Sequence, residues 1–299
     1  MNKTMSGWGN GLLGVLIFSG SLPATRVAVM GFDPVFLTGA RATLAGLLAG
    51  VLVLAFRARR PRRQDLFALV IVALGVVVGF PLLTALALEH VTSAHSIVFV
   101  GLLPLATAVF GVLRGGERPR PAFWLFSIAG SALVVGFAFS QGMTASPLGD
   151  LLMLGAILVC GLGYAEGATL SRRMGGWQVI CWALLLSLPV MLVVTLVALP
   201  GGFRAPDVPA WIGLGYVTVF SMLVGFVFWY RGLALGGTVA VGQLQLLQPF
   251  FGLALAALLL GETVTGGMLA VTIAVVACVA GAKAFAGRPQ VAKARVPAE

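Results

Sequence analysis

The sequence predicts an all-α integral membrane protein with ten transmembrane helices in two inverted five-helix repeats and both termini in the cytoplasm. Three observations predict this class: the composition, the apolar runs and the distribution of positive charge. Hydrophobic residues make up 60% of the 299 residues and charged residues only 9%, whereas roughly a quarter of a soluble domain is charged. The lipid bilayer is therefore the expected surroundings of most of the chain.

The apolar runs have the length of membrane spans. A helix needs about 20 apolar residues to cross a bilayer, and very short polar connections separate ten such runs. The predicted spans are residues 8–30, 34–56, 66–88, 92–113, 121–140, 148–170, 177–199, 209–231, 237–260 and 264–286. The polar residues 287–299 are expected to form a disordered cytoplasmic tail.

Positive charge fixes the predicted orientation. A cytoplasmic N-terminus places sixteen Lys and Arg residues inside and only Arg204 in an outside loop, as the positive-inside rule requires. One missed or invented span would move every later loop to the other side. The formal charge of +10 is thus explained by topology. Because the basic residues are scattered among short loops, nucleic acid is not an expected partner.

One stretch occurs twice at an offset of 145 residues, at Leu102–Glu117 and Leu247–Glu262. Both copies carry a proline near the start and end on Gly-Glu. Proline and acidic residues are scarce, with 15 and 9 in the chain, so the match predicts a duplication. The predicted repeats are residues 1–142 and 147–286. Because each has five spans, the second enters the bilayer from the opposite side, an architecture common among secondary transporters.

The prolines and glutamates of this stretch have predicted roles. Pro104 and Pro249 lie near mid-bilayer, where each removes a backbone hydrogen bond and permits a hinge; the alternative is that proline is simply tolerated there. For Glu117 and Glu262 we expect a structural role, in which glycine ends one helix and the glutamate stabilises the positive N-terminal end of the next.

These residues resemble those of a known family. Leu102-Leu103-Pro104 to Glu117, its second copy, and Gly39-Ala40-Arg41 are similar to motifs of the EamA branch of the drug/metabolite transporter superfamily. The resemblance implies ten spans in two homologous halves and export of small metabolites, above all amino acids, across the bacterial inner membrane. It also implies a central cavity among the first, third, fourth, sixth, eighth and ninth helices. The aromatic amino-acid exporters are one candidate subgroup.

Polar side chains inside spans are costly unless they face protein or water, so they are the natural candidates for substrate binding, together with aromatic residues beside them. The candidates are Ser19, Ser21, Thr84, His95, Phe99, Tyr164, Gln243, Gln245 and Gln248. Each has a structural alternative. A serine or threonine can bond the preceding turn, the histidine can be neutral and hydrogen-bonded rather than a proton-linked switch, and the glutamines can join helices.

The three glutamines are the most informative of these candidates. On an α-helix Gln245 and Gln248 lie about 60° apart, whereas Gln243 is turned away. A neutral amide both donates and accepts hydrogen bonds. Such a pair could therefore hold the carboxylate and the ammonium of an amino acid without burying a fixed charge.

Few residues inside the predicted spans are charged, and two aromatic residues lie where a span is expected to meet the membrane surface. Arg41 can snorkel outward, hold helix ends through their carbonyls, or meet a substrate carboxylate. Glu166 is expected to pair with Arg172 or Arg173, one to two turns along its helix. Trp229 and Tyr230 are expected in an interfacial aromatic belt. The alternative is that they form the wall of a cavity together with Tyr164 and Phe220.

Enzyme chemistry is not expected. The sequence offers two histidines and no paired carboxylates, so no catalytic residue, metal site or cofactor is predicted. A lipid-acting membrane enzyme or a non-transport scaffold remains the alternative class. The expected function is export of amino acids or similar small metabolites from the bacterial cell by a multi-pass inner-membrane protein, acting as a monomer or homodimer through alternating access. A non-amino-acid metabolite or a drug is the alternative cargo.

Overall fold

The computed structural model describes residues 3–91, 96, 99–140, 146–199, 206–248, 250–252, 254–255 and 266–286. All regular structure in these ranges is helical. Six helices are long and apolar enough to cross a membrane: Thr4–Val29, Pro34–Ala55, Arg63–His90, Pro147–Met174, Gly176–Val197 and Val208–Gly236. Three shorter apolar helices are Leu103–Gly115, Pro121–Phe137 and Ala270–Phe285. The chain is therefore a multi-pass membrane protein.

We call the described residues up to Ser140 the first half and those from Ser146 the second half. The elements of the first half are α1 (Lys3–Ser19), α2 (Ser21–Val29), α3 (Pro34–Ala55), α4 (Arg63–Val72), the π-helix η1 (Ala73–Gly79), α5 (Phe80–His90), α7 (Leu103–Gly115) and α8 (Pro121–Ser140). Those of the second half are α9 (Pro147–Met174), α10 (Gly176–Val197), α11 (Val208–Tyr216), the π-helix η2 (Val217–Val224), α12 (Gly225–Gly236), α13 (Thr238–Gly242), the 3₁₀-helix η3 (Gln243–Leu247) and α15 (Gly266–Phe285).

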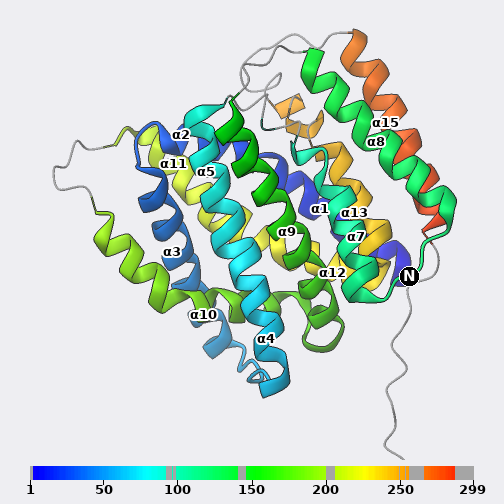
Figure 1. Ribbon diagram of the computed structural model, residues 1–299. Helices are drawn as coiled ribbons and strands as arrows, with labels where there is room; N and C mark the ends of the chain where they lie inside the picture. The colour runs from blue at the N-terminus through cyan, green and yellow to red at the C-terminus, as the bar shows by residue number, and fades with distance from the viewer. Residues whose placement is uncertain are drawn as a thin grey trace, which may run out of the picture.

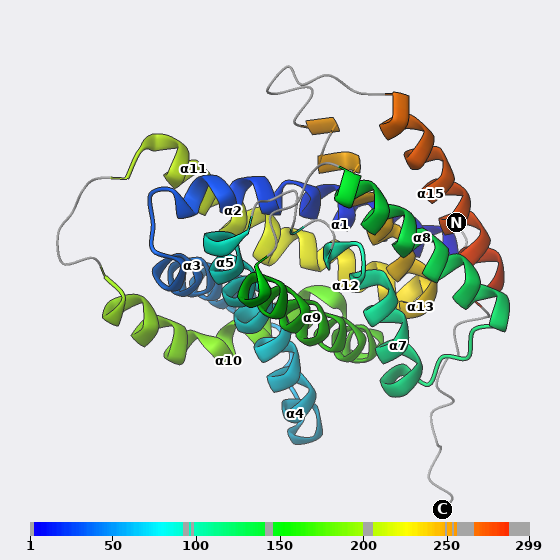
Figure 2. The ribbon, with the colours of Figure 1, turned by 45° about the horizontal axis from the view of Figure 1, so that its top comes forward.

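The two halves interleave rather than sit side by side. Helix α1 packs along α12, α3 along α10, α5 along α9, α7 against α13, and α8 along α15, and each of these pairs joins one half to the other. The α8–α15 pair stands at one edge of the bundle and the α3–α10 pair at the opposite edge (Figures 1 and 2). The helices between them, α1, α9 and α12, form the centre of the molecule.

Glycine allows the closest of these contacts. A Cβ on Gly232 of α12 would lie 2.6 Å from the backbone nitrogen of Gly11, and a Cβ on Gly7 would lie 2.5 Å from that of Gly236. Small residues four apart let helix backbones approach closely within a membrane. The position of α1 against α12 therefore depends on two facing glycine pairs.

Irregular segments recur at equivalent places in the two halves. The third span changes from α to π at Ala73–Gly79, and the eighth does so at Val217–Val224. These segments are 144 to 145 residues apart in the chain, which matches the offset of the duplicated stretch. Most π-segments are a single turn and many lie at functional sites. The duplication is therefore visible in the backbone as well as in the sequence.

The eighth span is longer than predicted. Helix α12 continues to Gly236, so exposed Arg231 lies within the helix rather than in a loop. Only Gly237, with φ 93° and ψ 138°, separates α12 from α13. Such a positive φ suits glycine, which has no Cβ. A single glycine thus replaces the loop that we expected between the eighth and ninth spans.

Candidate functional site

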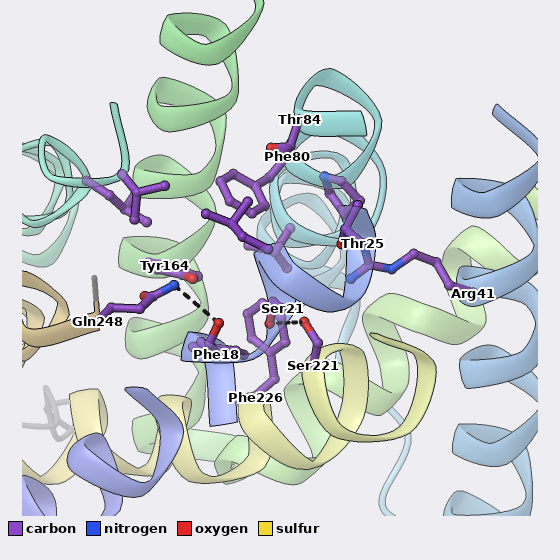
Figure 3. A pocket seen from close by; sticks show the side chains of 15 residues that line it. Phe18, Ser21, Thr25, Arg41, Phe80, Thr84, Tyr164, Ser221, Phe226 and Gln248 are labelled. Carbon is purple, nitrogen blue, oxygen red and sulfur yellow. Dashed lines mark hydrogen bonds between the residues drawn. The ribbon is translucent and has the colours of Figure 1, made fainter. Parts of the chain in front are cut away.

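A small cavity lies where the two halves meet. Its volume open to a water-sized sphere is about 50 Å³, which holds a few water molecules. Its lining comes from the first four predicted spans and from the sixth, eighth and ninth (Figure 3). The lining residues are Phe18, Ser21, Leu22, Thr25, Arg41, Val76, Phe80, Pro81, Thr84, Val100, Leu103, Tyr164, Ser221, Phe226 and Gln248. Both halves therefore contribute to one partly polar space.

A break in the first span shapes one wall of this cavity. Helix α1 ends at Ser19 and α2 begins at Ser21. Pro23 contributes to the break because it has no N–H to bond the carbonyl of Ser19, four residues earlier. The second half supplies donors to the backbone next to the break: the Tyr216 hydroxyl donates to the Ile17 carbonyl at 2.6 Å, and the Gln248 amide donates to the Phe18 carbonyl at 3.3 Å.

Four of the predicted binding residues line the cavity: Ser21, Thr84, Tyr164 and Gln248. The hydroxyl of Ser21 donates to that of Ser221 at 2.8 Å, which joins the two halves (Figure 3). The Thr84 hydroxyl is buried and has no hydrogen-bond partner among the described residues. The cavity thus gathers predicted residues from the first, third, sixth and ninth spans.

The other predicted binding residues lie elsewhere or outside the described part of the chain. The Ser19 hydroxyl is buried and donates to the Val15 carbonyl at 2.7 Å. Phe99 packs beside an apolar cluster that includes Val100. His95 and the predicted hinge residue Pro249 fall outside the described residues.

Gln243 and Gln245 are fully buried and do not line the cavity. They belong to the 3₁₀-helix η3, not to the α-helix that we expected. No hydrogen bond of normal geometry reaches either amide within the described residues, although the Tyr164 hydroxyl interacts with Gln245. Of the three glutamines, only Gln248 faces the cavity.

The other predicted hinge residue, Pro104, lies in the first turn of α7. Gly101 and Leu102 form a turn directly before this helix, and the Leu102 amide bonds the Phe99 carbonyl at 2.8 Å. Thus the helical path is interrupted just before the proline, beside two residues that line the cavity, Val100 and Leu103.

Arg41 is a cavity residue of particular interest that the sequence analysis left outside its candidate set. Its side chain is 7% exposed, and it is the only charged residue among the described lining residues. The guanidinium extends from α3 toward Thr25 (Figure 3). A lone arginine within an apolar span was a usable signal, because such residues usually face the interior of a helix bundle.

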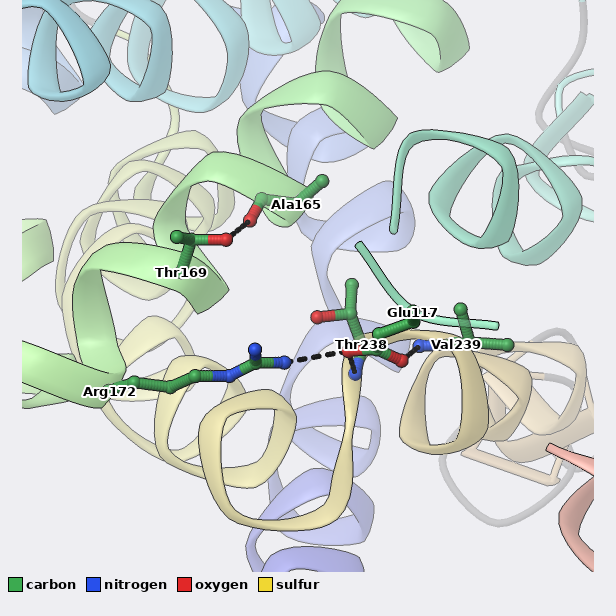
Figure 4. A network of polar contacts seen from close by, with 6 residues as sticks. All are labelled: Glu117, Ala165, Thr169, Arg172, Thr238 and Val239. Carbon is green, nitrogen blue, oxygen red and sulfur yellow. Dashed lines mark hydrogen bonds and ion pairs between the residues drawn. The ribbon is translucent and has the colours of Figure 1, made fainter. Parts of the chain in front are cut away.

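Glu117 connects the two halves through the backbone of the ninth span. Its carboxylate accepts hydrogen bonds from the backbone N–H groups of Thr238 at 2.8 Å and Val239 at 2.9 Å, and from Arg172 at 2.7 Å (Figure 4). Gly116, with φ 65°, ends α7 as predicted. The glutamate, however, caps α13 of the other half rather than the next helix along the chain. An anion at this position favours the positive N-terminal end of a helix.

Three ion pairs surround the C-terminal end of α9. Arg114 pairs with Glu166, Arg172 with Glu117, and Arg173 with Asp65 at 2.9 Å. The expected pairing of Glu166 with Arg172 or Arg173 is therefore wrong. The helix arrangement brings Arg114 of the first half to Glu166, which leaves both arginines of α9 for carboxylates of the first half. All three pairs join one half to the other.

The expected aromatic belt at Trp229 and Tyr230 is also wrong, because both side chains are fully buried. The Tyr230 hydroxyl donates to the Gly163 carbonyl at 3.2 Å. Trp229 packs against Phe18, with ring centroids 6.2 Å apart, and against Tyr164 at 5.4 Å. These rings form the central contact between α1, α9 and α12.

Within the described residues, no group of three or more His, Cys, Asp and Glu side chains could hold a metal ion. The cysteines Cys160, Cys181 and Cys278 are free thiols. The polar groups gathered at the cavity are hydroxyls, one amide and one guanidinium. These groups can bind a small polar molecule through hydrogen bonds.

A multi-pass helical bundle with a partly polar cavity between two related halves is typical of secondary transporters, a class of membrane transport proteins. The chain belongs to the EamA-like transporter family, whose profile matches residues 5–139 and 147–282. This family lies within the drug/metabolite transporter superfamily, as the motifs indicated. The match occurs once in each half, so the chain contains two EamA repeats.

Individual relatives agree with this family. The chain is 68% identical over 286 residues to the uncharacterized transporter YdeK of Bacillus subtilis, covering 96% of this chain and all of that protein. It is 25% identical over 243 residues to a probable terminal-alkyne amino-acid exporter of Streptantibioticus cattleyicolor, covering 80% of each. A crystal structure with 19% identity superposes with a TM-score of 0.77 over 94% of this chain and 98% of that one. That last likeness concerns the fold alone.

Proposed function

We propose that the protein exports amino acids, either broadly or with a preference for aromatic ones, or similar small metabolites. The observation that carries this proposal is the cavity between the halves, with hydroxyls and an amide near three phenylalanines, Phe18, Phe80 and Phe226. Such a lining suits a molecule with a polar head and an apolar body. The similarity to a probable amino-acid exporter supports the same cargo class.

The proposed mechanism is alternating access. At about 50 Å³ the cavity is too small for an aromatic side chain; for comparison, a protein cavity that binds benzene has a volume of roughly 150 Å³. Helices must therefore move apart to admit an amino acid. The ion pairs at the end of α9 join the halves on one side of the cavity, and we assign to them the closure of the cytoplasmic entrance.

The proposed topology has ten spans, with the repeats 1–142 and 147–286 inverted relative to one another and the tail 287–299 in the cytoplasm. Its support is the positive-inside distribution of charge. The proposed location is the bacterial inner membrane, with the protein acting as a monomer or homodimer.

The proposed substrate-binding set keeps Ser19, Ser21, Thr84, His95, Phe99, Tyr164, Gln243, Gln245 and Gln248, with Pro104 and Pro249 as hinges. Ser21, Thr84, Tyr164 and Gln248 are its central members because they line the cavity. Gln245 does not line the cavity itself, but it interacts with Tyr164, which does.

Counterflow in proteoliposomes tests the proposal. Vesicles with purified protein are loaded with one unlabelled amino acid, and uptake of its labelled form is measured across a panel, with and without a pH gradient. Protein-free vesicles are the control. We expect accumulation for at least one amino acid, and the ranking of the panel separates a broad from an aromatic preference. No signal for any amino acid would move the cargo to another metabolite class or a drug.

A binding measurement distinguishes a transporter from a membrane scaffold and from a lipid-acting enzyme. Detergent-solubilised carrier should bind the transported molecule, whereas a scaffold should bind none of the panel. A lipid-acting enzyme would convert its substrate instead of returning it unchanged.

A further inference from the structure

Arg41 has an unusual electrostatic environment for an arginine inside a membrane span. It lies in α3, its side chain is 7% exposed, and its Nε has no hydrogen-bond partner. Placing an arginine at the centre of a span is unfavourable by about 2.5–3.5 kcal/mol on insertion scales. A buried cation of this kind needs an anion or several hydrogen bonds.

No ion pair joins Arg41 to a carboxylate within the described residues. Asp65, Glu117 and Glu166 are each paired with another arginine. The described lining of the cavity contains no carboxylate. Arg41 is therefore without a counterion among the described residues.

Arg26, on the neighbouring helix α2, shows how an arginine in this protein is satisfied by backbone alone. Its guanidinium donates to the Leu88 carbonyl at 3.1 Å, and its side chain is exposed rather than buried. It does not line the cavity. The difference between Arg26 and Arg41 is thus one of position, since only Arg41 faces the space between the halves.

Two hydroxyls line the same cavity as Arg41, those of Thr25 on α2 and Thr84 on α5. Figure 3 shows the guanidinium directed at Thr25, with Thr84 on the next helix. The Thr84 hydroxyl has no partner among the described residues, so it is free to donate. A planar guanidinium binds a carboxylate through two parallel hydrogen bonds. Hydroxyl groups can donate to the lone pairs of the carboxylate oxygens that the guanidinium leaves free.

The opposite side of the cavity has different chemistry. Tyr164 and Gln248 lie across from Arg41 in Figure 3 and carry oxygen atoms that can accept from an ammonium group. Phe80 and Phe226 belong to the same lining. The cationic group of an amino acid would be repelled by Arg41 and attracted to this second side.

We propose that Arg41, with Thr25 and Thr84, forms a carboxylate-binding subsite that selects transported molecules carrying a free carboxylate. This inference rests on the proposed function, because it takes the cavity as the transport site. It adds the substrate class: monocarboxylates with an apolar body, bound with the carboxylate toward α3.

Matched ligands and matched variants test this subsite. Binding to the purified full-length protein is measured for phenylalanine, its carboxamide, phenethylamine and 3-phenylpropionate, and for leucine and its carboxamide. The variants are Arg41→Gln, Arg41→Lys and the control Arg26→Gln. We expect the unaltered protein to prefer each acid over its carboxamide, and Arg41→Gln to lose about 10- to 100-fold in affinity for the acids only. Arg41→Lys should lose less, and Arg26→Gln should bind as the unaltered protein does.

The outcomes separate this inference from the proposed cargo. A preference for acids that survives in Arg41→Gln would overturn the subsite while leaving amino-acid export intact. Binding of 3-phenylpropionate but of neither amino acid, lost in Arg41→Gln, would support the subsite and contradict the cargo. If Arg41→Gln does not fold, Arg41→Lys replaces it in the test. A lower ratio of acid to carboxamide affinity than in the unaltered protein would support the subsite, and an unchanged ratio would overturn it. Failure of every acid to bind the unaltered protein would overturn the subsite.

Discussion

At the scale of single residues, neighbouring side chains of one type occupy different environments. Gln243 and Gln245 are fully buried, whereas Gln248 is only partly buried and lines the cavity. A buried amide without a partner is unfavourable by about 1–3 kcal/mol. Gln248 avoids this because its amide bonds the Phe18 carbonyl and the rest of the group faces the cavity.

Replacing Gln248 with Leu tests the role of its amide. Removing a neutral hydrogen bond of about 0.5–1.5 kcal/mol should raise the half-saturation concentration for transport about 2- to 12-fold. Kinetics of counterflow measure this change. Gln178→Leu, on α10 and outside the cavity lining, is the matched control, and we expect it to leave half-saturation nearly unchanged. Equal effects of the two substitutions would contradict the distinction between them.

At the scale of secondary-structure elements, the helix ends and interruptions position the site. The break between α1 and α2 exposes Ser21 to the cavity. The N-terminal end of α13 is held by a carboxylate from the first half. These features join segments that are far apart in the chain, so a change at one helix end acts on both halves.

Glu117→Gln should weaken the cap on α13 and its ion pair with Arg172. A helix-end charge in a partly buried position contributes up to about 2 kcal/mol, and a hydrogen bond to a charged group contributes about 1.5–3 kcal/mol. We therefore expect the free energy of unfolding to fall by an amount of this order, seen as a lower melting temperature in detergent. Arg118→Gln, at an exposed neighbouring position, is the control. A melting temperature unchanged by Glu117→Gln would show that the cap contributes little.

Pro104→Ala tests the hinge in the fourth span. Alanine restores the N–H that proline lacks and favours a continuous helix through residues 101–104. A stiffer helix should slow turnover by more than it changes substrate affinity. Counterflow rates and equilibrium binding measure the two effects separately. Pro121→Ala, at the first position of α8, is the control because proline is expected there. Loss of affinity without slower turnover would contradict a hinge.

At the scale of the whole molecule, three ion pairs gather at one end of the bundle while the cavity lies between the halves. Two of their carboxylates are among the buried polar groups of the first half, Asp65 and Glu117. Breaking a buried pair by removing one partner leaves an uncompensated charge. Removing one partner of these pairs is therefore expected to weaken the contact between the halves around the C-terminal end of α9.

The ten-span topology predicts which side of the membrane each connection faces. Single cysteines are placed at Met30, expected outside, and at Arg60, expected inside, in a chain whose three native cysteines are replaced with alanine. A membrane-impermeant thiol reagent should label the cysteine at position 30 in intact cells and the cysteine at position 60 only after permeabilisation. Labelling of both positions in intact cells would contradict the proposed orientation.

The sequence by itself determined the membrane class, the duplication and the family, because composition, apolar length and motif spacing are properties of the linear chain. It also predicted four of the residues that line the cavity, Ser21, Thr84, Tyr164 and Gln248, because a polar group in an apolar span is conspicuous. Only the tertiary structure decided that Arg41 joins them, that Glu117 caps the opposite half and that Trp229 and Tyr230 are buried. Each of these depends on which helices meet across the two halves, and periodicity within a single helix carries no information about its partner.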